Sequence, residues 1–334
     1  MSSEQQHYEP ERANAAMIEA DLATADEVRA LSRWRRAWDS DVAYSFRRSP
    51  IAMISSAVAL IFILGAVFAP LIAPQNPFDP GSLNLMDGFT APLEPNAFTG
   101  NTFIMGTDDQ GRDIFSTILY GSRVSLMVGF AGVVFAMVLG TILGLTAGYL
   151  GGWVDAVIMR IADIQLSFPS ILIALLIFGV GKALLPREMQ DELAIYVLVL
   201  AIGLSGWVQF ARTVRGTTLV EKSKEYVQAA RLIGLHPMLI MLRHVLPNTL
   251  GPVLVIATIS LALAVITEAT LSFLGVGVPP TQPSLGTLIR IGQDFLFSGE
   301  WWITLFPSLA LVTLALSVNL LGDWLRDALN PKLR

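Results

Sequence analysis

The sequence of 334 residues contains no cysteine, only three histidines and few charged residues. Without cysteine, disulfide bonds, a thiol nucleophile and Cys-ligated metal sites are excluded. The histidines stand apart at positions 7, 236 and 244, so no metal site is expected. Asp, Glu, Lys and Arg make up 15% of the chain, against about 25% in an average soluble domain. This shortage of charge argues against a soluble globular protein.

Hydrophobic residues make up 53% of the chain and are gathered into long runs with almost no charge. About 20 consecutive apolar residues suffice for a helix to cross a membrane, so the runs predict an all-α integral membrane protein. The third run is the weakest, because it contains Asp163 and Gln165. The first run is longer than the apolar part of a signal peptide. Six transmembrane helices are expected, at residues 51–73, 122–148, 157–181, 194–211, 249–275 and 303–325.

Lysine and arginine are concentrated on one side of these spans. They are frequent before residue 49, between residues 212 and 243 and near the C-terminal end, and rare in the other loops. Because cytoplasmic loops carry the excess of basic residues, both termini are expected in the cytoplasm. The expected organisation is a cytoplasmic segment 1–48, a first span 49–74, a periplasmic loop 75–121, a transmembrane core 122–327 that includes a cytoplasmic loop 212–248, and a cytoplasmic tail 328–334.

Two short amphipathic helices are expected outside the spans. The first, in segment 1–48, lies on the membrane surface, and a loosely ordered tail is the alternative. The second, in loop 75–121, begins at Asp108 as N-cap and ends at Gly121, which forms the corner into the second span. A calcium loop at the sequence TDDQGRD is rejected, because its acidic spacing differs from that of an EF-hand. The apolar faces consist of Val28, Leu31, Trp34 and Trp38, and of Ile114, Phe115, Ile118 and Leu119.

The second span carries a small residue at every fourth position. Such a stripe lets two helix backbones approach closely in lipid, and we expect it to be a packing surface. The alternative is that glycine is simply common in spanning helices. The stripe consists of Gly132, Ala136, Gly140, Gly144 and Gly148.

The cytoplasmic loop 212–248 has the pattern of two short helices. EYVQAARLIG predicts two to three helical turns that end at Gly234. Pro237 favours the start of a second helix, and Pro247 is expected to mark the turn into the fifth span. Ala229 and Ala230 leave a shallow surface on which another protein could dock, although an ordinary surface loop explains the pattern equally well. The residues expected to pack the second helix against the spans are Leu239, Leu242 and Leu246.

This stretch resembles the coupling-loop motif of ABC importer permeases. That motif is Glu-Ala-Ala, three residues, Gly, nine residues, Ile, one residue and Leu-Pro. Gln replaces the acid here and His replaces the aliphatic residue, while every spacing is kept. GTDDQGRDIFSTILYGSRVSL, TEATLSFLGVGVPP and the proline-rich exit from the first span also resemble the dipeptide and oligopeptide branch, across about residues 45–330 and closest to its second permease. The matching residues are Gln228, Ala229, Ala230, Gly234, His244, Leu246 and Pro247.

The resemblance implies a type I ABC importer permease fold and a transport function without enzymatic activity of its own. It implies four kinds of partner in a bacterial cytoplasmic membrane: a second homologous permease, two cytoplasmic ABC ATPases, an external substrate-binding protein and the lipid bilayer. ATP and Mg would bind the ATPases, since this chain lacks a Walker A sequence. No cofactor and no nucleic-acid partner are expected. Short peptides are the expected substrate, and nickel complexes or sugar derivatives are alternatives.

Glu268 is a candidate residue of the substrate path. It lies well inside the fifth span, where a carboxylate is costly unless it is paired, protonated or beside water. Ser272 is expected on the same helix face, together with Ser260 and Ala264. Burial between helices, with a hydrogen bond to a neighbouring hydroxyl, is the alternative for Glu268. Arg160 and Asp163 are expected as an interfacial pair or cap.

Two other function classes agree less well with the sequence. An ion-driven secondary transporter would show broken helices in paired repeats, and no repeat is evident in the sequence. GLSG at residues 203–206 resembles the nucleophile motif of rhomboid intramembrane proteases. That chemistry needs a histidine base within the membrane, and the three histidines are all expected in the cytoplasm.

Overall fold

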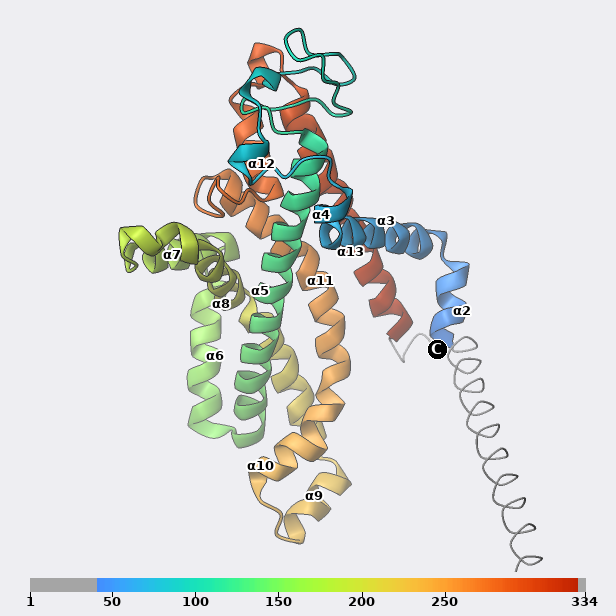
Figure 1. The fold of residues 1–334 in the computed structure, drawn as a ribbon. Helices are drawn as coiled ribbons and strands as arrows, with labels where there is room; N and C mark the ends of the chain where they lie inside the picture. The colour runs from blue at the N-terminus through green and yellow to red at the C-terminus, as the bar shows by residue number, and fades with distance from the viewer. Residues whose placement is uncertain (1–40, 330–334) are drawn as a thin grey trace, which may run out of the picture. The chain divides into compact units, whose positions relative to one another are not determined.

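The structure is a computed structural model that describes residues 41–329 (Figure 1). The predicted amphipathic helix around residues 28–38 lies outside the described residues, as do residues 330–334. The chain divides into two compact units, residues 1–53 and 54–334, which are described separately. In the first unit, α2 (Asp41–Arg48) is a short basic helix in which the Arg48 guanidinium lies 4.9 Å above the centre of the Tyr44 ring.

The second unit is built from helices joined by turns and by one long loop, residues 73–113, between α4 and α5. Among the described residues, five helices are long and apolar enough to cross a membrane, and α6 with α7 forms a sixth candidate that is bent by 99°. The prediction of an all-α membrane protein is therefore confirmed. From the start of the first long helix onward, the helices are α3 (Pro50–Val67), α4 (Ala69–Ile72), α5 (Ile114–Leu150), α6 (Gly152–Leu166), α7 (Ser170–Ala183), α8 (Gln190–Glu221), α9 (Glu225–Leu232), α10 (Pro237–Ile240), α11 (Leu246–Phe273), α12 (Leu285–Gln293) and α13 (Trp302–Leu329).

The third predicted span, 157–181, is not one straight helix. It is interrupted at residues 167–169, where Pro169 has no N–H to donate and disfavours helical geometry at the residue before it. The side chain of Gln165 bonds α6 to α8 just before the break. Its Nε2 donates to the Leu204 carbonyl at 2.9 Å, and its Oε1 accepts from Trp207 Nε1 at 2.8 Å. The polar residue that weakened the prediction thus fixes the bend in place.

The second span begins earlier than predicted. Residues 114–150 form one continuous helix, so there is no separate interfacial helix and no corner at Gly121. The N-cap is Asp113, whose carboxylate accepts from Ser116 N at 2.9 Å, and not Asp108. Asp108 is buried and bonds Arg112 instead, with Nε–Oδ2 at 2.6 Å. The carboxylate expected to begin a helix therefore stabilises the loop that precedes it.

The helices α5 and α8 lie side by side (Figure 1). A Cβ atom added to Gly144 would lie 2.4 Å from the Ala211 carbonyl oxygen, and one added to Gly140 would lie 2.5 Å from the Trp207 carbonyl oxygen. Side chains cannot occupy such positions without moving the neighbouring helix. Gly132 and Gly148 face Ile202 and Thr218 of α8 in the same way. The Cβ atom of Ala136 would lie 3.6 Å from a Cβ atom added to Gly206 of α8. The small-residue stripe faces α8 along its length.

Two ion pairs connect α6 to α8. Asp155 accepts hydrogen bonds from the guanidinium of Arg215, with Oδ2–Nη2 at 2.6 Å. Asp163 pairs with Arg212 and not with Arg160, which is exposed. The expected Arg160–Asp163 pair is wrong, because Arg212 of α8 pairs with the Asp163 carboxylate instead.

Candidate functional site

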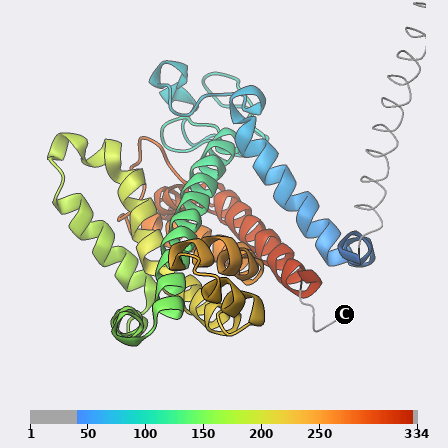
Figure 2. The same cartoon turned by 90° about the horizontal axis from the view of Figure 1, so that it is seen from below.

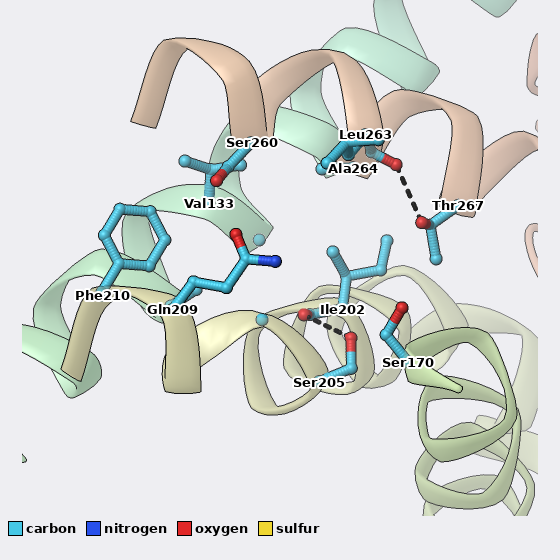
Figure 3. Close-up of a pocket in the computed structure, with 13 residues that line it drawn as sticks. Val133, Ser170, Ile202, Ser205, Gln209, Phe210, Ser260, Leu263, Ala264 and Thr267 are labelled. Carbon is cyan, nitrogen blue, oxygen red and sulfur yellow. Dashed lines mark hydrogen bonds between the residues drawn. The ribbon is translucent and has the colours of Figure 1, made fainter. Parts of the chain in front are cut away.

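A cavity lies between α5, α8 and α11, next to the first residue of α7 (Figure 3). It encloses about 90 Å³, whereas pockets that hold a small-molecule ligand typically measure about 300–1,000 Å³. Its lining contains polar side chains and no charged one. The polar members are Ser170, Ser205, Gln209, Ser260 and Thr267.

The side chains of this cavity differ in how far they are satisfied. The Thr267 hydroxyl donates to the Leu263 carbonyl at 2.8 Å, and the Ser205 hydroxyl donates to the Ile202 carbonyl at 2.8 Å. The Gln209 amide points into the cavity (Figure 3), and among residues 41–329 it has no hydrogen-bond partner. An amide without a partner is costly in hydrocarbon. Because Gln209 is exposed in this chain alone, we expect this side of α8 to face water, a solute or a neighbouring protein and not lipid.

Glu268 and Ser272 do not line this cavity. Both are buried, and the Ser272 hydroxyl donates to Glu268 Oε1 at 2.7 Å. The hydroxyl groups of Ser125 on α5 and Ser284 at the start of α12 also lie beside the carboxyl group. Glu268 is thus buried where α11, α5 and the start of α12 meet, and its Oε2 atom has no hydrogen-bond partner among the described residues.

Sequence reasoning missed Gln209 and Thr267. It placed Ser260, Ala264, Glu268 and Ser272 on one face, but successive steps of four residues drift around a helix with 3.6 residues per turn. Ser260, Ala264 and Thr267 follow the spacing i, i+4, i+7 and line the cavity, whereas Glu268 turns toward Ser284 at the start of α12 and Ser272 accepts from Val278 N. The i, i+4, i+7 pattern of small and polar residues was the available signal.

A second candidate site is the loop formed by α9 and α10, which lies beyond the ends of α5, α8 and α11 (Figures 1 and 2). We call residues 221–248 the coupling loop. α9 ends before Gly234, whose φ of +80° is the left-handed conformation that favours glycine. α10 begins at Pro237, with the His236 side chain accepting from Met238 N at 3.3 Å. The two short helices lie where the sequence placed them.

The two alanines of the motif point in opposite directions. Ala230 is 4% exposed and packs with Val227 in the buried apolar cluster. Ala229 is exposed, as is Gln228, whose Nε2 donates to the Ser223 carbonyl at 2.9 Å. The exposed surface continues into large apolar side chains, with Leu232 88% and Ile233 76% exposed. We call Gln228, Ala229, Leu232 and Ile233 the outer face of α9.

The second helix of the coupling loop packs inward through only one of the three predicted leucines. Leu246 is half-buried and packs against the core cluster, as predicted, whereas Leu239 and Leu242 are exposed. The other residues that pack inward are Ile240, Met241 and Val245.

The chain does not turn at Pro247. It stays helical from Pro237 to Phe273, and residues Met241–Val245 form a π-helical turn. Proline cannot donate to the carbonyl four residues earlier, and its ring crowds that carbonyl. In this chain that carbonyl belongs to Arg243, inside the π turn, so Pro247 widens the preceding turn without ending the helix. π turns of this kind are frequent at functional sites.

Comparison with known proteins identifies the family. The family described as "Binding-protein-dependent transport system inner membrane component" matches residues 140–334, more than half of the chain. This chain belongs to that family. Residues 32–92 of the permease also match the "N-terminal TM domain of oligopeptide transport permease C".

Several curated relatives match the permease over nearly its whole length. It is 37% identical to the dipeptide transport system permease protein DppC of Alkalihalophilus pseudofirmus, over 92% of this chain and 93% of that protein. It is 35% identical to the oligopeptide transport system permease protein OppC of Bacillus subtilis, over 98% of this chain and 97% of that protein. A chain of the MetNI methionine ABC transporter is 20% identical, with a TM-score of 0.49, over 64% of this chain and 96% of that chain.

Proposed function

We propose that this permease subunit imports di- or oligopeptides across a bacterial inner membrane, driven by ATP hydrolysis on partner subunits. The observation that carries the proposal is the outer face of α9. This face exposes two large apolar side chains, Leu232 and Ile233, beside Gln228 and Ala229, on a helix whose other face is buried. Adjacent exposed apolar side chains beside polar ones are typical of a protein or membrane interaction site, and we propose a protein partner here. The basic residues around the coupling loop support a cytoplasmic location for that interface, where an ATPase would dock.

The cavity supports a transport path for uncharged or zwitterionic solutes. Hydroxyl and amide groups line it without any charged side chain, so it offers hydrogen bonds of the kind that peptide groups make. Its small volume indicates that this chain forms only part of the path. A second homologous permease would supply the remaining wall.

The complete importer would contain this permease, a second permease, two ABC ATPases that bind ATP and Mg, and an external substrate-binding protein. Both termini of the permease would lie in the cytoplasm, and the loop between α4 and α5 would lie outside. In this arrangement Gln228, Ala229 and Gly234 belong to the contact with the ATPase. Ala230, His244, Leu246 and Pro247 shape the loop from within.

Purification and transport test the proposal together. The tagged permease is isolated from membranes of its own bacterium, and the complex is placed in proteoliposomes. Radiolabelled di-alanine or penta-alanine is added on the side of the membrane that the substrate-binding protein faces. We expect ATPase subunits in the complex and uptake that needs ATP. Leu232→Asp should remove the ATPases, while Phe98→Asp, at an equally exposed residue of the α4–α5 loop, should retain them.

Three outcomes would contradict the proposal. Uptake that follows an ion gradient without ATP would indicate a secondary transporter. ATP-driven uptake of nickel complexes or sugar derivatives, but not of peptides, would change the substrate. Retention of the ATPases by Leu232→Asp would place the docking surface elsewhere.

A further inference from the structure

One tyrosine hydroxyl joins three helices at the coupling loop. Tyr226, on α9, donates a hydrogen bond to the carboxylate of Glu221, the last residue of α8. The same oxygen accepts from Asn248 Nδ2, near the start of α11, at 2.9 Å. Asn248 Nδ2 also donates to the His244 carbonyl in the π turn, at 2.8 Å. Both hydrogen-bonding capacities of the hydroxyl are thus used, one toward each neighbouring helix.

The Glu221 side of this linkage is fixed. Glu221 is 6% exposed, and its other oxygen pairs with Lys224 Nζ at 2.6 Å. A hydrogen bond to an ionised acceptor is about twice as strong as one between neutral groups. Burial and the bond to Glu221 also raise the pKa of the Tyr226 hydroxyl above its ordinary value of 10.0, so the donated proton stays in place.

The other connections between α9 and α11 are more compliant. The covalent route passes through Gly234, a short turn and the π turn at Met241–Val245, where the regular hydrogen-bond ladder is interrupted. The apolar route packs Val227 and Ala230 within the buried cluster, and such packing has no preferred direction. Within residues 41–329, the Tyr226 hydroxyl is the side-chain group that hydrogen-bonds α9 to both helices.

We propose that the Tyr226 hydroxyl is the link through which a displacement of α9 reaches both α8 and α11. This inference rests on the proposed function, in which a partner ATPase moves α9. α8 carries Gln209 and α11 carries Ser260 and Thr267, so a link to both helices connects the ATPase surface to two walls of the cavity. Tyr226 is a positioning residue in this account, since it lies outside the cavity and the outer face of α9.

The test uses the complete importer in proteoliposomes and measures the number of radiolabelled di-alanine molecules taken up for each ATP hydrolysed. Tyr226→Phe removes both hydrogen bonds and keeps the ring. We expect this transport ratio to fall about tenfold, equivalent to about 1.4 kcal/mol, while the ATPase subunits still copurify. Tyr196→Phe is the matched control, because this exposed tyrosine lies toward the other end of α8, and its ratio should stay unchanged.

Two further variants separate a link from a merely structural role. Val227→Ala weakens the packing of α9 and should lower the melting temperature without lowering the ratio. Asn248→Leu removes the α11 branch and should lower the ratio, and adding it to Tyr226→Phe should cause no further loss, because both act through one hydroxyl.

Each contrary result overturns the proposal. An unchanged ratio in Tyr226→Phe, or an equal fall in Val227→Ala, would show that the hydroxyl transmits nothing. Additive losses in the double variant would show that Asn248 acts independently. A wild-type complex that takes up peptide without ATP would contradict the proposed function itself, and this inference with it.

Discussion

The packing of α5 against α8 allows a quantitative prediction for Gly144→Ala. The added Cβ would lie 2.4 Å from the Ala211 carbonyl oxygen, so the helices must separate by about 0.6 Å to reach even a 3.0 Å contact. A gap of this size forfeits about a quarter of the dispersion energy of neighbouring contacts. Overpacking in such sites costs about 1–3 kcal/mol.

Alanine is the better helix former, by about 1 kcal/mol in water, which acts in the opposite direction. In lipid this gain largely disappears, since a spanning segment keeps its backbone hydrogen bonds and stays helical even when helices separate. The clash therefore dominates, and we expect a net destabilisation of about 1–3 kcal/mol. Gly216→Ala, on α8 with nothing within 4 Å of the added Cβ, is the control that introduces no clash; because residue 216 lies beyond the predicted span 194–211, alanine should leave its stability unchanged or raise it by up to about 1 kcal/mol.

Thermal denaturation of the permease in lipid nanodiscs, followed by the fraction that remains monodisperse, measures both variants. Gly144→Ala should melt at a lower temperature than the wild type, whereas Gly216→Ala should melt at the wild-type temperature or above it. Equal melting of Gly144→Ala and Gly216→Ala would refute the view that backbone contact joins α5 to α8.

Three other perturbations address separate parts of the permease. Gln209→Leu should slow peptide uptake without changing complex assembly, because it removes the free amide from the cavity, and uptake at the wild-type rate would contradict that role. Burial, reinforced by the charge of Asp108, raises the pKa of Asp109 above 3.8. The folded state therefore favours the neutral carboxyl group of Asp109. The stability contributed by this protonated carboxyl group is lost as the pH rises through the raised pKa. Asp109→Asn should have a higher melting temperature than the wild type at neutral pH and the same melting temperature below pH 3.8. A lower melting temperature than the wild type at neutral pH would contradict the raised pKa. Glu268→Ala should lower the melting temperature by removing the acceptor of Ser272, whereas Glu268→Gln should preserve it, and equal melting would contradict a structural role.

The sequence predicted the class of structure because each spanning helix is a long apolar run, and lipid demands that its backbone be satisfied internally. Boundaries set by local polar groups were harder to predict. Gly121 resembled a corner, yet it lies within α5, where its missing side chain lets Leu285 approach. The true start was encoded by Asp113, three residues before Ser116, the usual spacing of an N-cap.

The candidate sites could be predicted only where local spacing decided them. Gly234 and Pro237 have conformational preferences that act within one turn, and both helices of the coupling loop begin or end accordingly. The orientation of Ala230 and the position of Gln209 depend on which neighbour covers which face. Such tertiary contacts connect residues that are distant in sequence, and no single helical pattern contains them.

The contacts of α11 determine how its motion would act on the cavity. Near the far end of α11, Glu268 lies beside Ser125 and Ser284. A Cβ atom added to Gly129 of α5 would lie only 2.8 Å from the Val265 side chain, so the two helices are in close contact there. That end is held tightly, whereas the Asn248 end follows a π turn. The distance from Asn248 to Glu268 is about 30 Å along a helix that rises 1.5 Å per residue. Ser260 lies about 12 Å from the held end on the same scale, so a tilt would move it by about two-fifths of the displacement at Asn248. Since Thr267 lies next to the held end, a tilt of α11 would change the cavity more beside Ser260 than beside Thr267.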